Sequence, residues 1–177
     1  MHFLDYYYGY IVKYDLLNKF NYKNIKNFPK IKKIILNWNY INAKQSLSTL
    51  LSLNLLVYQK SKLKTTKTTN IYLKIQKGDP ILIQVILINK TLINLFLSKL
   101  ILHLTFNYKQ TNIGKFFFFK SSLNSFIFKF KKSLNFIELE KNFKFFNQLK
   151  NLQIIILTSS RNKKELIFLL KSYKFPL

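Results

Sequence analysis

Residues 28–39 open with a proline and a lysine-rich segment and continue into the apolar run Ile34-Ile35-Leu36, and this pattern predicts a β-strand. Pro29 has no amide hydrogen to donate to a neighbouring strand, which suits a strand's first position, and the branched Ile34 and Ile35 favour a half-buried extended backbone. Because successive side chains point to opposite faces, Lys33 and Asn37 share one face. The other face carries Lys30, Lys32, Ile34, Leu36 and Trp38. A lysine beside an amide suits a polar polymer carrying phosphates, and an edge strand with a solvated face explains the pattern equally well.

Apolar residues at helical spacing predict helices at residues 5–20, 46–58 and 91–105 and after residue 162. Asp5 is the expected cap of the first helix, and Asn162 with Glu165 resembles a capping box at the start of the last. We expect His103 to lie in the core or at its boundary. One face of the second helix, whose leucines we expect in the core rather than in a binding groove, carries Leu47, Leu50, Leu51, Val57 and Tyr58.

Short runs of branched and aromatic residues predict further strands at residues 71–75, 81–88, 126–132 and 153–157. Residues 76–80 contain the glycine and the proline of a turn. The run Phe116–Phe119 is expected in the core, although aromatic rings beside lysines also suit base stacking. Together the elements predict an α+β fold, a single domain over residues 1–177 with helices packed on an antiparallel β-sheet.

Residues 59–70 form the most polar stretch between the predicted elements. They contain four lysines, four threonines and no acid, so they supply many donors for phosphate oxygens and little apolar surface to bury. This composition predicts a basic loop or an edge strand.

The charge balance strengthens the case for a polyanionic partner. Thirty Lys and Arg residues stand against six Asp and Glu residues, a net charge of +24 that destabilises a folded chain through self-repulsion. An AT-rich gene explains part of the lysine content and the single arginine, Arg161, but it does not explain so few acids. Because lysine is a point charge, we expect contacts to phosphates rather than to base edges.

The sequence offers few groups for catalysis. It has no cysteine, two distant histidines and three isolated glycines, so it predicts no enzyme, no metal site and no cofactor. Residues 81–105 have the length of a membrane span, but Asn89, Lys90 and Lys99 interrupt them. A strand, a turn and a helix are therefore expected there, and no membrane is expected as a partner.

The first residues resemble neither a secretory signal nor an arginine-rich transit peptide. An AT-rich composition without an import sequence suggests synthesis inside an organelle, with a mitochondrion expected and a plastid as the alternative.

Several short motifs occur in a fixed order: Asp5-Tyr6-Tyr7, Phe20-Asn21-Tyr22, the strand at residues 29–37, Gln59-Lys60, Thr66-Lys67, the turn at residues 73–81 and Lys174-Phe175-Pro176. This series resembles the large-ribosomal-subunit protein five family, the 5S-rRNA-binding proteins of the central protuberance. The resemblance covers nearly the whole chain.

The resemblance implies two sets of contacts. The family's contacts to 5S rRNA map onto Lys33, Asn37, Gln59, Thr66 and Lys67, and the adjacent Lys30, Lys60 and Lys62 extend the expected rRNA-binding surface. The family's turn toward the elbow of P-site tRNA maps onto Lys74, Gln76, Lys77 and Gly78. The stretch before the last pair of strands implies a bridge to the small-subunit head.

The chain also departs from the family pattern. Gln76 replaces the arginine of the turn, Trp38-Asn39-Tyr40 replaces glycines, and Ile86 replaces a threonine that supports 5S binding. Since many mitochondrial ribosomes lack 5S rRNA, large-subunit rRNA or a bound tRNA is the alternative occupant of the basic face.

We therefore expect a structural protein of a mitochondrial large ribosomal subunit. Its expected partners are rRNA, P-site tRNA, a small-subunit head protein and neighbouring large-subunit proteins. Two alternatives stay open: an RNA-binding module outside the ribosome, and a small organellar membrane protein with a span at residues 81–105.

Overall fold

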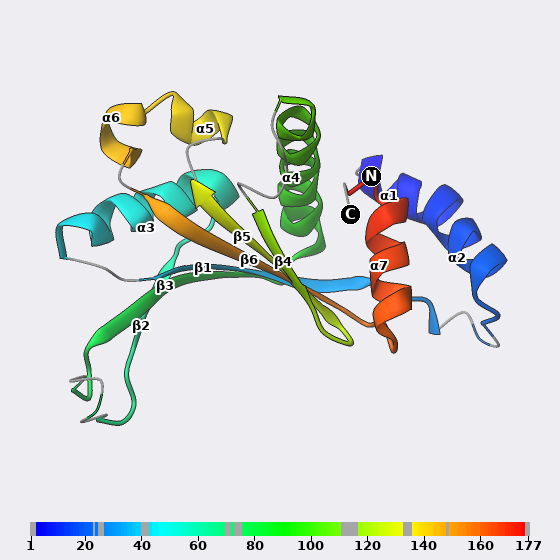
Figure 1. Cartoon of the computed structure of the whole chain (residues 1–177), viewed down its shortest axis with the longest axis horizontal. Helices are drawn as coiled ribbons and strands as arrows, with labels where there is room; N and C mark the ends of the chain where they lie inside the picture. Colours follow the sequence, from blue (N-terminus) through cyan, green and yellow to red (C-terminus); the bar gives the residue numbers. More distant parts are fainter. Residues whose placement is uncertain are drawn as a thin grey trace. The chain divides into compact units, whose positions relative to one another are not determined.

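The computed structural model describes residues 3–22, 24, 27–39, 43–69, 72, 76–110, 117–132, 136–147 and 149–175, and for residues 43–44, 105–110, 117–120, 131–132 and 150 only the backbone. The fold is α+β, with helices packed on an antiparallel sheet, as predicted (Figure 1). Within these residues the strand order is β2-β3-β1-β6-β5-β4.

The strands agree with the sequence pattern. Their bounds are β1 (Ile31–Asn39), β2 (Lys62–Thr65), β3 (Pro80–Leu87), β4 (Phe117–Ser121), β5 (Ser125–Lys132) and β6 (Lys150–Thr158). The expected strands at 28–39, 81–88, 126–132 and 153–157 are confirmed. The strand expected at 71–75 lies outside the described residues. The core position expected for Phe116–Phe119 concerns side chains that the structure does not describe.

The chain divides into two compact units, and each is described by itself. The first unit comprises Met1–Ile34, Leu87–Phe128 and Ile155–Leu177, and the second comprises Ile35–Ile86 and Lys129–Ile154. The expectation of a single domain over residues 1–177 stays a prediction.

The first unit begins with a helix that changes its hydrogen-bonding pattern midway. It consists of α1 (Phe3–Tyr7), the π-helical turn η1 (Tyr8–Val12) and α2 (Lys13–Lys19), which confirms the helix expected at residues 5–20. Its inward side chains are Leu4, Val12 and Leu16, whereas Tyr6, Tyr10 and Tyr14 are exposed. The tyrosines at helical spacing therefore form the outer stripe of this helix.

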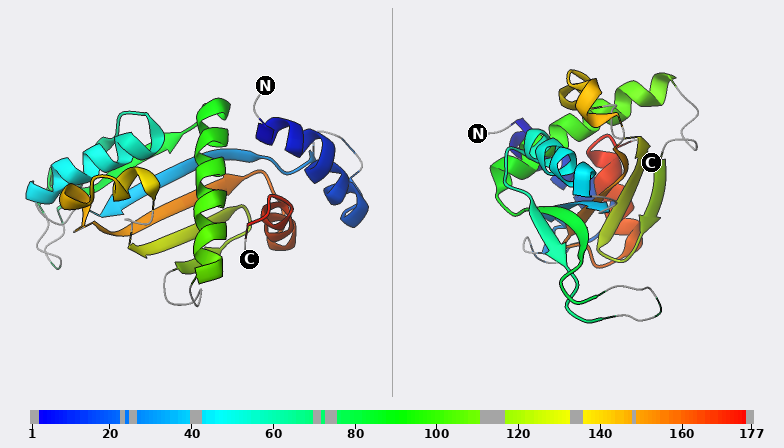
Figure 2. Two further views of the ribbon diagram at one scale, coloured as in Figure 1. Left: turned by 90° about the horizontal axis from the view of Figure 1, so that it is seen from above. Right: turned by 90° about the vertical axis from the view of Figure 1, so that its left-hand side faces the viewer.

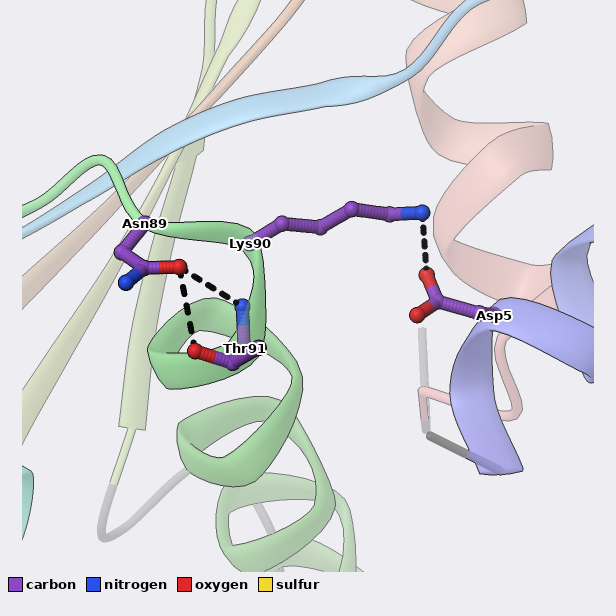
Figure 3. A network of polar contacts seen from close by, with 4 residues as sticks. All are labelled: Asp5, Asn89, Lys90 and Thr91. Carbon is purple, nitrogen blue, oxygen red and sulfur yellow. Dashed lines mark hydrogen bonds and ion pairs between the residues drawn. The ribbon is translucent and has the colours of Figure 1, made fainter. Parts of the chain in front are cut away.

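Asp5 does not cap the first helix, because the helix already includes Phe3. Its carboxylate instead forms an ion pair with Lys90, in which Oδ1 and Nζ lie 2.7 Å apart (Figure 3). Lys90 opens α4 (Lys90–Gln110), and Asn89 caps that helix by accepting hydrogen bonds from the backbone N–H and the hydroxyl of Thr91. The expected helix at 91–105 is thus confirmed.

The last helix, α7 (Lys163–Ser172), contacts η1 and α2, and its start departs from the expected capping box because Glu165 bonds the residue before the cap. Glu165 accepts hydrogen bonds from the Arg161 backbone N–H (2.7 Å) and from the Tyr22 hydroxyl. Asn162 occupies the cap position without a side-chain cap bond. The buried carboxylate of Glu165 therefore joins the start of α7 to the segment that precedes β1.

The second unit contains three helices in its described part: α3 (Ala43–Val57), α5 (Ile137–Glu140) and α6 (Phe143–Phe146). They lie on one face of this unit's strands, and β2 and β3 extend together away from α3 to a hairpin (Figure 2). The core assignment in α3 was wrong for most residues, because Leu47, Leu51 and Tyr58 are exposed and Leu50 is partly so. The buried apolar side chains are Leu53, Leu56 and Val57.

The membrane alternative finds no support in the fold. Residues 81–105 divide between β3 and α4, and within the described ranges no helix is both long and apolar enough to cross a bilayer. His103 is buried in α4, as expected.

Candidate nucleic-acid interface

Strand β1 separates the two sets of side chains that its period of two predicts, and one of the two faces is buried. Ile34, Leu36 and Trp38 are at most 1% exposed, so they belong to the core. On the opposite face Lys33 is exposed and Asn37 is half-buried. The burial of one face thus fixes the direction in which Lys33 and Asn37 point.

Asn37 is linked across the sheet to the neighbouring strand. Its Oδ1 accepts a hydrogen bond of 2.7 Å from Nε2 of Gln84 in β3. Gln84 lies opposite Lys62 in the antiparallel pairing of β2 with β3, and paired residues point to the same side of a sheet. Asn37 and Lys62 therefore lie on one face of the second unit. No helix in the described part of this unit covers that face (Figure 1).

Of the two alternatives that the composition of residues 59–70 left open, a basic loop or an edge strand, residues 62–65 form the edge strand β2. It ends the strand order, and all four of its residues, Lys62, Leu63, Lys64 and Thr65, are exposed. Gln59 and Lys60 precede it and are exposed as well. The backbone N–H of Ser61 donates to Oδ1 of Asn54 in α3 (2.8 Å), which fixes the approach to the strand.

Hydrogen bonds join the two arms of the β2–β3 hairpin at its described end. The backbone N–H of Thr66 donates to the Asp79 carbonyl (2.9 Å), and the Gly78 N–H donates to the Thr66 carbonyl (3.1 Å). The Thr66 hydroxyl donates to the carbonyl of Gln76. Gly78 has φ +97°, a conformation that favours glycine. The expected rRNA contact Thr66 thus lies beside the expected tRNA contacts Gln76 and Gly78.

Sequence reasoning gave no role to Asp79, which closes this turn. Its Oδ2 accepts a hydrogen bond of 2.7 Å from the Gln76 N–H. The signal was present, because an aspartate between a glycine and a proline commonly bonds nearby backbone amides in turns. Its carboxylate is engaged within the turn, while Lys67 and Lys77 are exposed on either arm.

The remaining expected contacts, Lys30, Lys33 and Lys74, are not among the described residues of the β2–β3 hairpin. Lys30 and Lys33 belong to the first unit, where the Lys30 backbone N–H donates to the Ser159 hydroxyl (2.9 Å) and its side chain is exposed. Lys74 lies outside the described residues. Among the side chains that the structure describes, no three His, Cys, Asp or Glu residues gather to hold a metal ion.

Removing the Asp79 carboxylate tests whether this turn orders the lysines. We expect Asp79→Ala to cost about 1–2 kcal/mol in the stability of the hairpin, because the Gln76 N–H loses a charged acceptor. Amide hydrogen exchange should accelerate at Gln76 and Gly78 and stay unchanged in α7. Unchanged exchange at Gln76 would show that the backbone bonds alone hold the turn.

Comparison with known proteins shows relatives over the full length of the chain. The chain is 34% identical over 184 residues to the large ribosomal subunit protein uL5m of Reclinomonas americana, with 100% of this chain and 98% of the relative covered. It is 30% identical over 168 residues to the large ribosomal subunit protein uL5c of Oedogonium cardiacum, covering 91% and 89%. The uL5c protein of Stigeoclonium helveticum is 31% identical over the same length. No family model matches the chain.

Proposed function

Because the chain belongs to the uL5 family of large-ribosomal-subunit proteins, and is thus a structural constituent of an organellar large subunit, we propose that it holds rRNA at the central protuberance and contacts P-site tRNA. We place it in a mitochondrion, since a mitochondrial relative matches the whole chain.

The rRNA-binding surface combines the outer face of β1 with the basic edge strand. The observation that carries this proposal is that Asn37 and Lys62 share one face that no described helix of the second unit covers, with the exposed Lys60 and Lys67 before and after β2. Lysines spaced along a strand neutralise successive phosphates without reading the bases, so binding should weaken steeply as salt rises. Gln59 and Thr66 complete this surface in the second unit, and Lys30 and Lys33 are the proposed rRNA contacts of the first unit.

The hairpin end is the proposed contact to P-site tRNA. A backbone hydrogen bond holds Gly78 to Thr66, and the Thr66 hydroxyl holds the Gln76 carbonyl. The side chains of Gln76 and Lys77 are exposed, so one small turn presents an amide side chain and a cation to a phosphate backbone. Lys74 belongs to the same proposed contact. A protein of the small-subunit head and neighbouring large-subunit proteins complete the proposed set of partners.

The rRNA in question is 5S rRNA where the ribosome has one, and large-subunit rRNA where it does not. Crosslinking the protein to RNA in intact organelles, followed by sequencing of the attached RNA, distinguishes the two. We expect central-protuberance rRNA together with tRNA. Recovery of no RNA above background, or of RNA from particles that sediment apart from large subunits, would contradict the proposal.

A further inference from the structure

The first unit contains a cavity of about 520 Å³, whose lining residues share only Lys30 with the proposed rRNA contacts. Residues of η1, α2, α4 and the start of β1 line it, together with Tyr173. This volume lies in the range of pockets that bind small organic groups.

The rim of the cavity is strongly cationic. Lys13, Lys30, Lys32 and Lys90 line it against one carboxylate, Asp5, which is paired with Lys90 (Figure 3). Asp5 is the one acid among the lining residues that the structure describes, so no second lining acid is present there for the other three lysines. An anionic group at the rim would therefore find three cations.

The wall of the cavity is aromatic and apolar. The Tyr8 ring stacks on the Tyr173 ring with centroids 6.2 Å apart and planes 13° apart, and its hydroxyl donates to the Pro29 carbonyl (3.0 Å). Burial raises the pKa of Tyr8 to about 12, so this hydroxyl keeps its proton at neutral pH. The ring is thus fixed in place, with Lys13 Nζ 5.9 Å from its centroid, and the apolar Ile93 and Leu97 of α4 line the same cavity.

The π-helical turn η1 supplies part of this wall. Gly9 lines the cavity, and a Cβ atom added there would meet nothing within 4 Å, so the turn leaves open space at this position. π-Helical turns inside α-helices occur frequently at functional sites.

A polar group among the lining residues lacks a partner. Asn94 of α4 is 7% exposed, and its Nδ2 makes no hydrogen bond to any described atom. Leaving a buried amide unbonded destabilises a fold, so such a group calls for a partner that the described part of the chain does not provide. Rotation about the last side-chain bond exchanges Nδ2 and Oδ1, so Asn94 can offer either a donor or an acceptor.

We propose that this cavity accepts one unstacked nucleotide of the bound RNA, with the base against Tyr8 and hydrogen-bonded to Asn94, and with its phosphates beside Lys13, Lys30 and Lys32. Proteins commonly recognise single-stranded RNA through splayed bases that stack on aromatic rings and bond polar side chains. A phosphate alone would need neither the apolar wall nor the buried amide. This inference rests on the proposed RNA-binding function.

The test compares two labelled single-stranded RNA decamers of equal charge, one intact and one abasic at its central positions, binding to the full chain. We expect the intact RNA to bind about tenfold more tightly, since stacking and one hydrogen bond to a base together supply at least that ratio. Asn94→Leu, which keeps the shape but removes the amide, should abolish most of this preference.

Thermal unfolding separates a ligand-binding role for Asn94 from a structural one. If the amide is kept for a ligand, Asn94→Leu should raise Tm by about 2–4 °C, because it removes an unbonded polar group. Ile88→Trp, a second variant at an exposed cavity residue, should narrow the cavity and lower the base preference without lowering Tm. Asn18→Leu, at an exposed position of α2, is the matched control and should change neither quantity.

Each outcome bears on one of the two proposals. Equal binding of intact and abasic RNA by the wild-type chain, with a steep salt dependence, would overturn the nucleotide pocket and leave the RNA-binding function intact. A base preference that survives both Asn94→Leu and Ile88→Trp would overturn the pocket as its source. Failure of both RNAs to bind would overturn the pocket and contradict the proposed function as well.

Discussion

Reversing two charges on the proposed rRNA surface should lower the affinity of the chain for its RNA by on the order of 100-fold. In Lys33→Glu with Lys67→Glu, two exposed cations become anions, and each lost charge-assisted phosphate contact removes about 1.5 kcal/mol or more. The slope of log affinity against log salt should also fall by about 1.8, since two phosphates are no longer neutralised. RNA titrations at several salt concentrations and sedimentation with large subunits measure both effects.

The matched control is a double variant with the same change in charge on a different surface. Lys163→Glu with Lys164→Glu alters two exposed lysines at the start of α7 and should leave affinity within about threefold of wild type. Neither double variant should change Tm by more than a few degrees, because surface substitutions usually change stability by about 0.5 kcal/mol or less. Normal sedimentation of the Lys33 and Lys67 double variant with large subunits would show that the wrong face was assigned.

The largest expected effect on stability comes from the core residue that supports this surface. Trp38 is 1% exposed, and Trp38→Ala should cost about 3–5 kcal/mol through lost burial and the cavity left behind. For a chain of this size, that corresponds to a fall in Tm of about 10 °C. Circular dichroism on heating measures the fall.

Ile35→Ala is the control for Trp38→Ala, because Ile35 lies on the opposite, half-buried face of the same strand. Ile35→Ala should cost about 1 kcal/mol, which is less than half of the cost expected for Trp38→Ala. Equal losses for the two variants would mean that β1 is buried on both faces and that its polar face is not free for RNA.

The parts of the fold that the sequence predicted are those with a local cause. The assignment of side chains to the two faces of β1 follows from the period of two of an extended strand, and the turn at Gly78 follows from a backbone conformation that glycine favours. The edge strand β2 follows from a composition with little to bury. Each of these features is encoded within about ten residues, so no knowledge of distant partners was needed.

The wrong predictions concern residues whose burial or bonding partner depends on contacts with distant parts of the chain. Helix α3 has leucines on more than one face, so helical spacing alone could not tell that Leu53 and Leu56 point inward while Leu47 and Leu51 point outward. Asp5 has the chemistry of a cap, yet its partner Lys90 is far along the chain. The joining of Thr66 to Gly78 depends on the register of β2 against β3, which residue patterns leave undetermined.

The exposed lysines on β1, β2 and the hairpin also bear on the supply of this protein in its organelle. A chain with a net charge of +24 repels itself, and under the proposed function RNA neutralises these side chains, so the assembled copy would be the more stable one. Copies made in excess of rRNA unfold more often and are removed by proteases more readily. The abundance of the protein would then follow the supply of rRNA, without a dedicated regulator of its synthesis.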